Sequence, residues 1–288
     1  MTLLDTGFRR LGRSDFAAQA CGFNLRNTPT REQIAMIEAA LAEHGVVVFR
    51  GQPLDAQQQS GFIRSFGPPT VTPVKELATK NPGFVDVGTV DDEGKPILSD
   101  SVQSVYLRAN LLWHTDGSFN QPPVRLTALL ARELPPEPPP TEYADMRAAW
   151  EALPAAKQAE LEGLQVEHSI LRSREQMGMT AEQFSSETLA RQPVTHPLVR
   201  VHPVNGRKSL YLASHASHIV GRPLQEGRAL LLELIAFATQ PQFVYSHAWQ
   251  PDDLVMWDDR WTMHRATPYS GPHPRKMRQC TVREIEPV

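Results

Sequence analysis

The sequence is poor in cysteine, in net charge and in long apolar runs, and each shortage makes a class of protein improbable. Its 288 residues include only two cysteines, Cys21 and Cys280, outside any Cys-x-x-Cys spacing. That scarcity argues against a disulfide framework or a thiolate metal site and favours a reducing, cytoplasmic location. The formal net charge of −3, without a long basic stretch, gives no sign of nucleic-acid or membrane-surface binding. A small-molecule partner is therefore expected.

Several familiar signals are also missing. There is no run of about 20 apolar residues that would predict a membrane span, and the N-terminal residues lack a small-residue cleavage site. Neither GxGxxG nor GxxxxGK[ST] occurs, so a dinucleotide or nucleotide-phosphate loop is not expected. With 41% hydrophobic and 21% charged residues, the composition is typical of a globular chain with a sizeable core.

The pattern of helices and strands favours an α+β fold. A capping box at Thr30 to Gln33 predicts a helix over residues 31–44, and the apolar run 46–49 predicts a buried strand. Further helices are expected at 55–66 and within 223–240, and further strands at 124–132, 243–247, 253–257 and 277–285. Strands near both ends with helices between them favour a barrel or double sheet whose far ends pair.

Three connecting regions have patterns of their own. Asn205-Gly206 lies between the apolar runs 198–202 and 209–212, which predicts a hairpin with a type I′ turn. Residues 70–108 show no sustained period and are interpreted as strands and a long loop. The polar stretch 171–192 is interpreted as an insertion or a lid over a substrate site.

A possible metal site combines two neighbouring residues with a distant one. In an extended segment, His114 and Asp116 point to the same face and can offer a nitrogen and an oxygen to one ion. His264 would complete a set of two histidines and one carboxylate, which leaves open positions on the metal and suits ferrous iron. A single His-x-Asp is common on protein surfaces, so the surrounding sequence must show whether His114 and Asp116 bind a metal.

Five segments resemble a known family. They are Trp113-His114-Thr115-Asp116, the run from Thr141 to Trp150, Gly206 to Leu210, His215-Ala216-Ser217-His218, and Asp253 to Asp258 leading to His264-Arg265. Together they resemble the TauD/TfdA family of iron(II)/2-oxoglutarate-dependent dioxygenases, especially its chlorophenoxyacetate branch. The resemblance covers nearly the whole chain. It implies a single domain over residues 1–288 with a double-stranded β-helix (jelly-roll) core and flanking and inserted helices.

The resemblance also implies roles for particular residues. His114, Asp116 and His264 would hold Fe(2+), with 2-oxoglutarate and O2 as cosubstrates. Arg275, eleven residues after His264, and Thr141 would bind the far carboxylate of 2-oxoglutarate. A guanidinium suits this role because it offers two parallel donors to a carboxylate. Asn110 matches a family position that lines the site near cosubstrate and substrate.

The sequence departs from the family pattern at two places. Pro138-Pro139-Pro140 precedes Thr141, where the family usually has Gly-Gly-Asp, which removes donors beside the expected site. Gln279 stands where taurine dioxygenase has an arginine for the anionic head of its substrate. A carboxylate-bearing substrate is therefore expected to be held by a loop cation, Lys75 or Arg108, and taurine is expected to be a poor substrate.

The implied activity is hydroxylation of a small organic acid, with ether cleavage of an aryloxyalkanoate as the candidate reaction and succinate and CO2 as co-products. A homo-oligomer, dimer or tetramer, is expected. One alternative is a non-catalytic jelly-roll protein that binds metal or acts as a sensor. Another is a zinc hydrolase with the same three ligands, although no HExxH glutamate is present to serve as its base.

Overall fold

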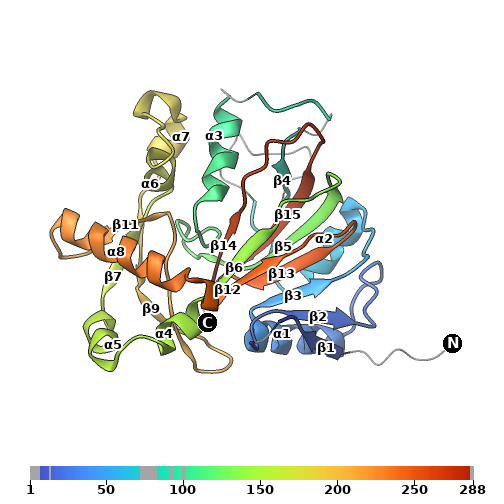
Figure 1. Cartoon of the computed structure of the whole chain (residues 1–288), viewed down its shortest axis with the longest axis horizontal. Helices are drawn as coiled ribbons and strands as arrows, with labels where there is room; N and C mark the ends of the chain where they lie inside the picture. Colours follow the sequence, from blue (N-terminus) through green and yellow to red (C-terminus); the bar gives the residue numbers. More distant parts are fainter. Residues whose placement is uncertain (1–6, 13, 72–82, 91–93, 99–100, 286–288) are drawn as a thin grey trace.

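A seven-stranded sheet forms the centre of the fold in the computed structural model, which describes residues 7–12, 14–71, 83–90, 94–98 and 101–285 (Figure 1). Its strands, in spatial order, are β1 (Gly7–Arg10), β2 (Ala18–Cys21), β3 (Val46–Phe49), β13 (Leu254–Asp258), β5 (Val124–Glu133), β15 (Lys276–Arg283) and β4 (Val85–Gly88). All neighbours are antiparallel except β2 and β3, which are parallel. The sheet therefore pairs strands from both ends of the chain, as the sequence predicts.

A smaller sheet packs against one face of the large one. Its strands are β12 (Val244–His247), β6 (Thr141–Asp145) and β14 (Thr262–Ala266), with β6 in the centre. Tyr143 of β6 shares a buried cluster with Val48, Leu129 and Trp257 of the large sheet. Two facing, mainly antiparallel sheets with helices around them confirm the expected α+β, jelly-roll fold.

Two helices cover the other face of the large sheet. Helices α1 (Arg31–His44) and α2 (Ala56–Arg64) each begin at a capping box, at Thr30 and Asp55. Each cap residue accepts a hydrogen bond from the backbone N–H three residues later, so helix donors are satisfied where the chain turns. Ile37 and Phe62 pack with strand residues such as Met256, which alternate with those facing the small sheet.

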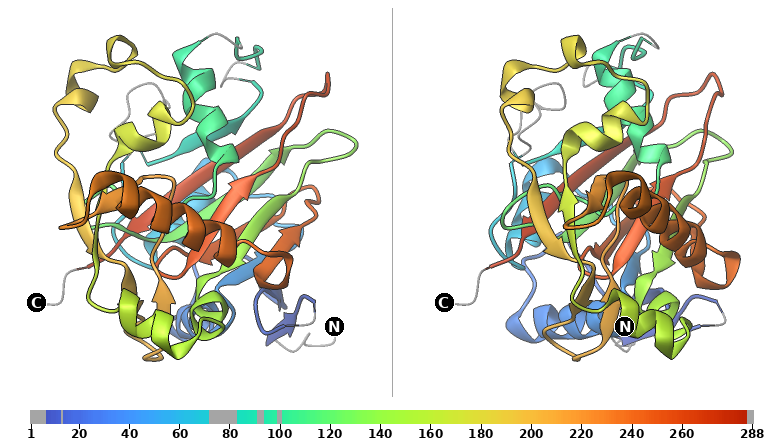
Figure 2. Two further views of the ribbon diagram at one scale, coloured as in Figure 1. Left: turned by 60° about the vertical axis from the view of Figure 1, so that its left-hand side comes forward. Right: turned by 90° about the vertical axis from the view of Figure 1, so that its left-hand side faces the viewer.

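Another group of helices and strands surrounds a second buried cluster beside the small sheet. Its helices are α4 (Met146–Glu151), α5 (Ala155–Leu161) and α8 (Leu224–Ala238), followed by the short η4 (Pro241–Phe243). Its strands are β7 (Gln165–His168), β8 (Val194–Pro197), β11 (Ala216–Ile219) and the hairpin of β9 (Val199–Val201) and β10 (Lys208–Leu210). Both views in Figure 2 show α8 lying across this part of the molecule. Leu230, Leu231 and Leu234 are its buried face.

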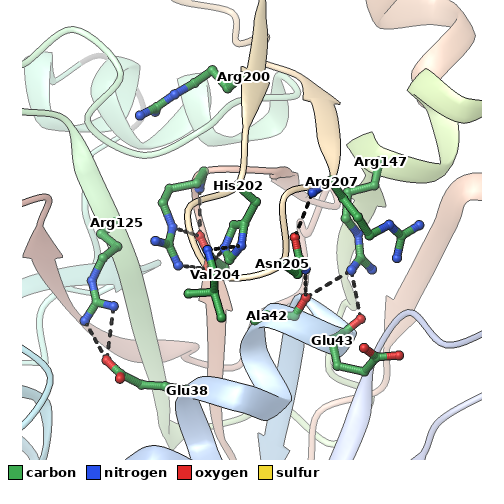
Figure 3. A network of polar contacts seen from close by, with 12 residues as sticks. Glu38, Ala42, Glu43, Arg125, Arg147, Arg200, His202, Val204, Asn205 and Arg207 are labelled. Carbon is green, nitrogen blue, oxygen red and sulfur yellow. Dashed lines mark hydrogen bonds and ion pairs between the residues drawn. The ribbon is translucent and has the colours of Figure 1, made fainter.

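The β9–β10 hairpin is confirmed, but its turn is not the two-residue type I′ that Asn-Gly predicts. Val201 pairs with Lys208, so six residues connect the strands. The Asn205 side chain donates to the carbonyl of Ala42 at the end of α1 (2.7 Å), and Arg147 donates to the same carbonyl (3.2 Å) (Figure 3). Asn205 therefore caps a helix end, which a tight turn would not allow.

The region interpreted as strands and a long loop contains an unexpected helix. Residues 102–108 form α3 (Val102–Arg108), which continues into η2 (Ala109–Leu111). The helix packs against the inserted segment 171–192, whose short helices are α6 (Ile170–Glu175), η3 (Ala181–Gln183) and α7 (Ser186–Leu189). Tyr106, Ile170, Met179 and Phe184 share a buried cluster there. The apolar residues of α3 pack against this distant segment and not against neighbours in the sequence. The local sequence therefore shows no helical period that would predict the helix.

In the described part of the chain, no helix combines the length and the apolar character needed to span a membrane.

Candidate active site

His114 and His264 are held side by side by their own backbones. The His114 N–H donates to the carbonyl of His264 (3.0 Å), and the His264 N–H donates back to His114 (2.8 Å). This isolated bridge extends the edge of β14, and the two imidazole centroids lie 4.2 Å apart. Asp116 Oδ1 lies 3.7 Å from His114 Nε2, and its Oδ2 lies 3.7 Å from His264 Nε2. The three ligand atoms lie within 4.8 Å of one another, a spacing that one metal ion can bridge.

The protonation of the two histidines suits metal binding. Burial lowers the pKa of His114, despite the nearby Asp116, and burial followed by His114 lowers the pKa of His264 well below its ordinary value. Both rings are therefore neutral at pH 7. His114 Nδ1 donates to the carbonyl of Leu112 (2.8 Å), which leaves the Nε2 lone pair facing Asp116.

Two side chains fix the Asp116 carboxylate. Thr127 Oγ1 on β5 lies 2.9 Å from Asp116 Oδ2, and Gln279 Nε2 on β15 donates to the same oxygen (2.7 Å). Gln279, expected from the sequence near the head of the substrate, therefore contacts the candidate metal ligand. Its amide donor is used by a carboxylate that belongs to the protein.

A second carboxylic acid lies behind the first. Asp259 is fully buried, accepts from the Asp116 backbone N–H (3.1 Å) and the Trp257 indole (3.1 Å), and lies 2.7 Å from Thr127 Oγ1. Burial and then Asp116 raise the pKa of Asp259 well above its ordinary value. A protonated Asp259 can donate to the Thr127 hydroxyl, which then donates its single proton to Asp116.

Sequence reasoning alone missed both Thr127 and Asp259. Asp259 directly follows the motif segment 253–258, so its position was available from the sequence. Its contacts were not, because they depend on the register of β13 against β5, where Trp257 lies opposite Thr127.

One pocket joins the histidines to Arg275 and Thr141. The pocket is lined by these four residues and also by Asn110, Leu129, Trp257 and Gln279. Arg275 is buried and its Nε has no hydrogen-bond partner among the described residues. Burial lowers its pKa to about 10, so the guanidinium stays charged at pH 7.

Thr141 is placed to share an anion with Arg275. Its Oγ1 accepts a hydrogen bond from the Trp249 indole (3.0 Å), which leaves the hydroxyl proton for another acceptor. The three prolines do not displace Thr141, which is the first residue of β6 and pairs with Ala266 of β14. The Pro140 carbonyl instead accepts from the backbone N–H and hydroxyl of Thr267.

A second pocket meets the first at Asn110, His114 and Gln279. Its walls include apolar residues from separate segments, Val85, Leu107, Phe119 and Val124, and it also contacts Asp116, Arg174 and His215. Asn110 therefore lines both pockets. We call the first pocket, which contains Arg275 and Thr141, the strand pocket. We call the second pocket, which contains Phe119 and Arg174, the loop pocket.

Of the two expected loop cations, Arg108 is not among the described residues that line the loop pocket. Arg108 lines a third pocket, beside Tyr269 and Arg275, and its Nη1 donates to Ser104 (2.7 Å). Lys75 lies outside the described residues.

Residues 8–281 match the family described as "Taurine catabolism dioxygenase TauD, TfdA family". The chain belongs to this family. It is an oxidoreductase that uses Fe(2+), 2-oxoglutarate and O2, and the expected recognition is confirmed.

Known proteins resemble this dioxygenase over nearly their full lengths. It is 42% identical over 270 residues to "Alpha-ketoglutarate-dependent 2,4-dichlorophenoxyacetate dioxygenase" of Burkholderia sp. (strain RASC), covering 92% of this chain and 91% of the relative. It is 34% identical to "(S)-phenoxypropionate/alpha-ketoglutarate-dioxygenase" of Sphingobium herbicidovorans, covering 84% of this chain and 83% of the relative. A crystal structure of "AAD-2 in complex with Mn(II) and N-oxalylglycine" superposes with a TM-score of 0.92 at 41% identity, covering 98% of this chain and 99% of that chain.

The residues of this dioxygenase fit the groups that its family uses. Two neutral imidazoles and a carboxylate match the ligand set preferred by ferrous iron in oxygenases. The unpartnered Nε of Arg275 and the available Thr141 proton offer donors to a carboxylate in the strand pocket.

Proposed function

We propose that this dioxygenase hydroxylates a small organic acid of the aryloxyalkanoate class and cleaves its ether bond. One observation carries the proposal: the loop and strand pockets meet at the cluster of His114, Asp116 and His264. The strand pocket contains the buried cation Arg275, which suits a dicarboxylate. The loop pocket has apolar walls, which suit an aryl group. Relatives described as acting on 2,4-dichlorophenoxyacetate and phenoxypropionate support this class.

In this proposal, His114, Asp116 and His264 hold the iron. The neutral histidines bind through Nε2, while Gln279 and the Thr127 hydroxyl keep the Asp116 carboxylate in place. Arg275 and Thr141 hold the far carboxylate of 2-oxoglutarate, and Asn110 lies between cosubstrate and substrate. When bound, iron and 2-oxoglutarate would activate O2, which would be the oxidant: one oxygen atom would enter succinate as 2-oxoglutarate loses CO2, and the other would be inserted into the C–H bond of the substrate.

The protein's own contribution is to position one C–H bond and exclude water. Apolar residues of the loop pocket hold the aryl group, so that the carbon bearing the ether oxygen faces His114 and Asp116. Hydroxylation of that carbon gives a hemiacetal, which breaks down to a phenol and an oxo acid. The hydroxylation therefore suffices for ether cleavage.

Taurine is proposed to be a poor substrate. The Gln279 amide donates to Asp116, and a glutamine offers dipoles where taurine dioxygenase has a fixed positive charge. A sulfonate would find no cation at that position.

The test measures succinate release and substrate loss with Fe(2+), using 2,4-dichlorophenoxyacetate and taurine. Coupled succinate and phenol release from the aryl ether, with little turnover of taurine, is expected. Metal binding without succinate would favour the sensor alternative, and turnover with zinc but without 2-oxoglutarate would favour a hydrolase. Efficient turnover of taurine would contradict the proposed substrate class.

We also propose a cytoplasmic location and assembly into a dimer or tetramer. The free thiols of Cys21 and Cys280 support a reducing compartment. Light scattering after size-exclusion chromatography tests the assembly, and a monomeric mass would contradict it.

A further inference from the structure

Arg174 is a buried cation in the loop pocket for which the reaction has so far given no role. It lies on α6 of the inserted segment, and only 7% of its surface is exposed. Its guanidinium stacks 4.8 Å from the Tyr106 ring, and Nη1 donates to Ser173 Oγ (2.8 Å) and lies 3.4 Å from His215 Nε2. No carboxylate in the described residues forms an ion pair with it, and its Nε has no partner there.

A buried charge without a counter-ion is costly, so such a position is suited to an anionic ligand. Burial lowers the pKa of Arg174 to about 10, while Tyr106 and Asp116 oppose that shift. The guanidinium is therefore charged at neutral pH. Binding a carboxylate would supply both a counter-charge and an acceptor for the donors that remain.

The neighbours of Arg174 hold it in a fixed orientation. Burial, and then Arg174 itself, lowers the pKa of His215 well below its ordinary value, so the imidazole is neutral and can accept a hydrogen bond at Nε2. His215 Nδ1 lies 3.3 Å from Ser118 Oγ, and its ring packs 4.7 Å from the centroid of Phe119. A guanidinium positioned in advance loses less side-chain entropy when it binds a ligand.

Arg174 is also close to the candidate iron ligands. It contacts His215, whose ring centroid lies 6.3 Å from that of His114, and all three side chains line the loop pocket. Arg275, in contrast, lines the strand pocket and is absent from the lining of the loop pocket. The two buried guanidiniums therefore serve different pockets.

We propose that Arg174 binds the carboxylate of the substrate, while the apolar walls at Leu107 and Phe119 hold its aryl group. This inference rests on the proposed function, because it assigns a residue to the acid that is oxidised. It also gives the inserted segment a defined role, since α6 brings the substrate's counter-charge to the pocket. Arg108, which lines another pocket, would then not be needed for this contact.

The test compares 2,4-dichlorophenoxyacetate with its neutral methyl ester on three variants at α6, and on Arg108→Met and Lys75→Met. Arg174→Met removes the charge and keeps much of the side-chain stem, whereas Arg174→Lys keeps the charge. Arg172→Met is the matched control, because it removes one charge from the same helix but lines a different pocket. KM and kcat are measured by succinate release, and acid binding is measured by calorimetry with Mn(II) and N-oxalylglycine present.

Arg174→Met is expected to raise KM and Kd for the acid about ten- to a hundredfold, with little change for the ester. Arg174→Lys should recover part of the loss, and Arg172→Met should behave like the native protein. An Arg174→Met variant that still distinguishes acid from ester as the native protein does would overturn the inference. The inference would also be overturned if Arg108→Met or Lys75→Met, and not Arg174→Met, raised KM and Kd for the acid.

Failure of the inference can be told apart from failure of the proposed function. A native protein that releases no succinate with either aryl compound contradicts the proposed function. If the native protein oxidises the acid and Arg174→Met does so with an unchanged KM, only the assignment of Arg174 is wrong.

Discussion

The strand pocket and the loop pocket meet at the same metal cluster but are built in different ways. Thr141 and Arg275 are placed at or beside the ends of β6 and β15, and His264 lies within β14. The loop pocket combines strand residues, such as Val85 of β4 and Val124 of β5, with residues from outside the sheets. These are Leu107 from α3, Phe119 from a connecting segment and Arg174 from the inserted segment. On the proposed function, the residues for iron and cosubstrate lie mainly on or beside paired strands, whereas Leu107, Phe119 and Arg174 reach the substrate from segments that can vary independently.

This difference predicts that changes in the two pockets have separable consequences. Strand register fixes atoms on several neighbouring strands at once, so a substitution there should affect metal or 2-oxoglutarate binding. A substitution in the connecting segments should affect substrate binding first. The following predictions are ordered by their expected effect on the metal and cosubstrate.

His264→Ala should have the largest effect and abolish 2-oxoglutarate decarboxylation, because it removes one of three candidate ligands. The fold should remain, since a bridge of backbone atoms still joins residues 114 and 264. Anaerobic iron titration and thermal unfolding measure the two effects. His273→Ala, at an exposed position, is the control, and full iron affinity in His264→Ala would disprove the ligand set.

Arg275→Met should raise KM for 2-oxoglutarate about ten- to a hundredfold, because hydrogen bonds to a charged group contribute about 1.5 to 3 kcal/mol. Lys276→Met is the matched control, since it removes a charge from the next position of the chain and Lys276 is not among the residues that line the strand pocket. Steady-state kinetics at saturating substrate make the comparison. An unchanged KM would move the role to another cation.

Thr127→Val should weaken Mn(II) binding about tenfold, because it removes the hydroxyl between Asp259 and Asp116 while keeping the side-chain shape. Thr262→Val is the control. It is also a buried threonine, but its Oγ1 has no hydrogen-bond partner in the described residues. Equal Mn(II) affinities for the two variants would show that the Thr127 contact does not support Asp116.

Met179→Ala should have the smallest effect on the metal and cosubstrate. It removes a side chain from the cluster that joins α3 to the inserted segment, so local opening of residues 171–192 should increase. Amide hydrogen exchange should rise there and stay unchanged in β5 and β14. Affinity for N-oxalylglycine should remain native, and a marked loss would mean that the two pockets are not separable.

The sequence was informative about the strand pocket because its signals are local. His114 and Asp116 alternate on one segment, and the family resemblance implies a role for the arginine eleven residues after His264, which is Arg275. The family resemblance then supplied the partnership between distant segments. These features depend on spacing along the chain, which a sequence displays directly.

The loop pocket could not be predicted in the same way. Helix α3 owes its stability to apolar contacts with residues some 70 positions later, such as Met179. Arg174 lies in a polar stretch of the sequence. Nothing in that stretch predicts that Arg174 is buried while the nearby Arg172 is only partly buried. The six-residue turn at Asn205 differs from the predicted two-residue turn for the same reason, because a carbonyl of α1 takes its side chain.

Calorimetry on the Mn(II)-loaded protein gives the most direct test of two separate anion sites. N-oxalylglycine and then 2,4-dichlorophenoxyacetate are titrated into the native protein, Arg275→Met and Arg174→Met. We expect that Arg275→Met weakens binding of N-oxalylglycine, and that Arg174→Met weakens binding of the aryloxyacetate while N-oxalylglycine binds with native affinity. If Arg174→Met weakens N-oxalylglycine as strongly as Arg275→Met does, or leaves the aryloxyacetate unaffected, the division between the pockets is wrong.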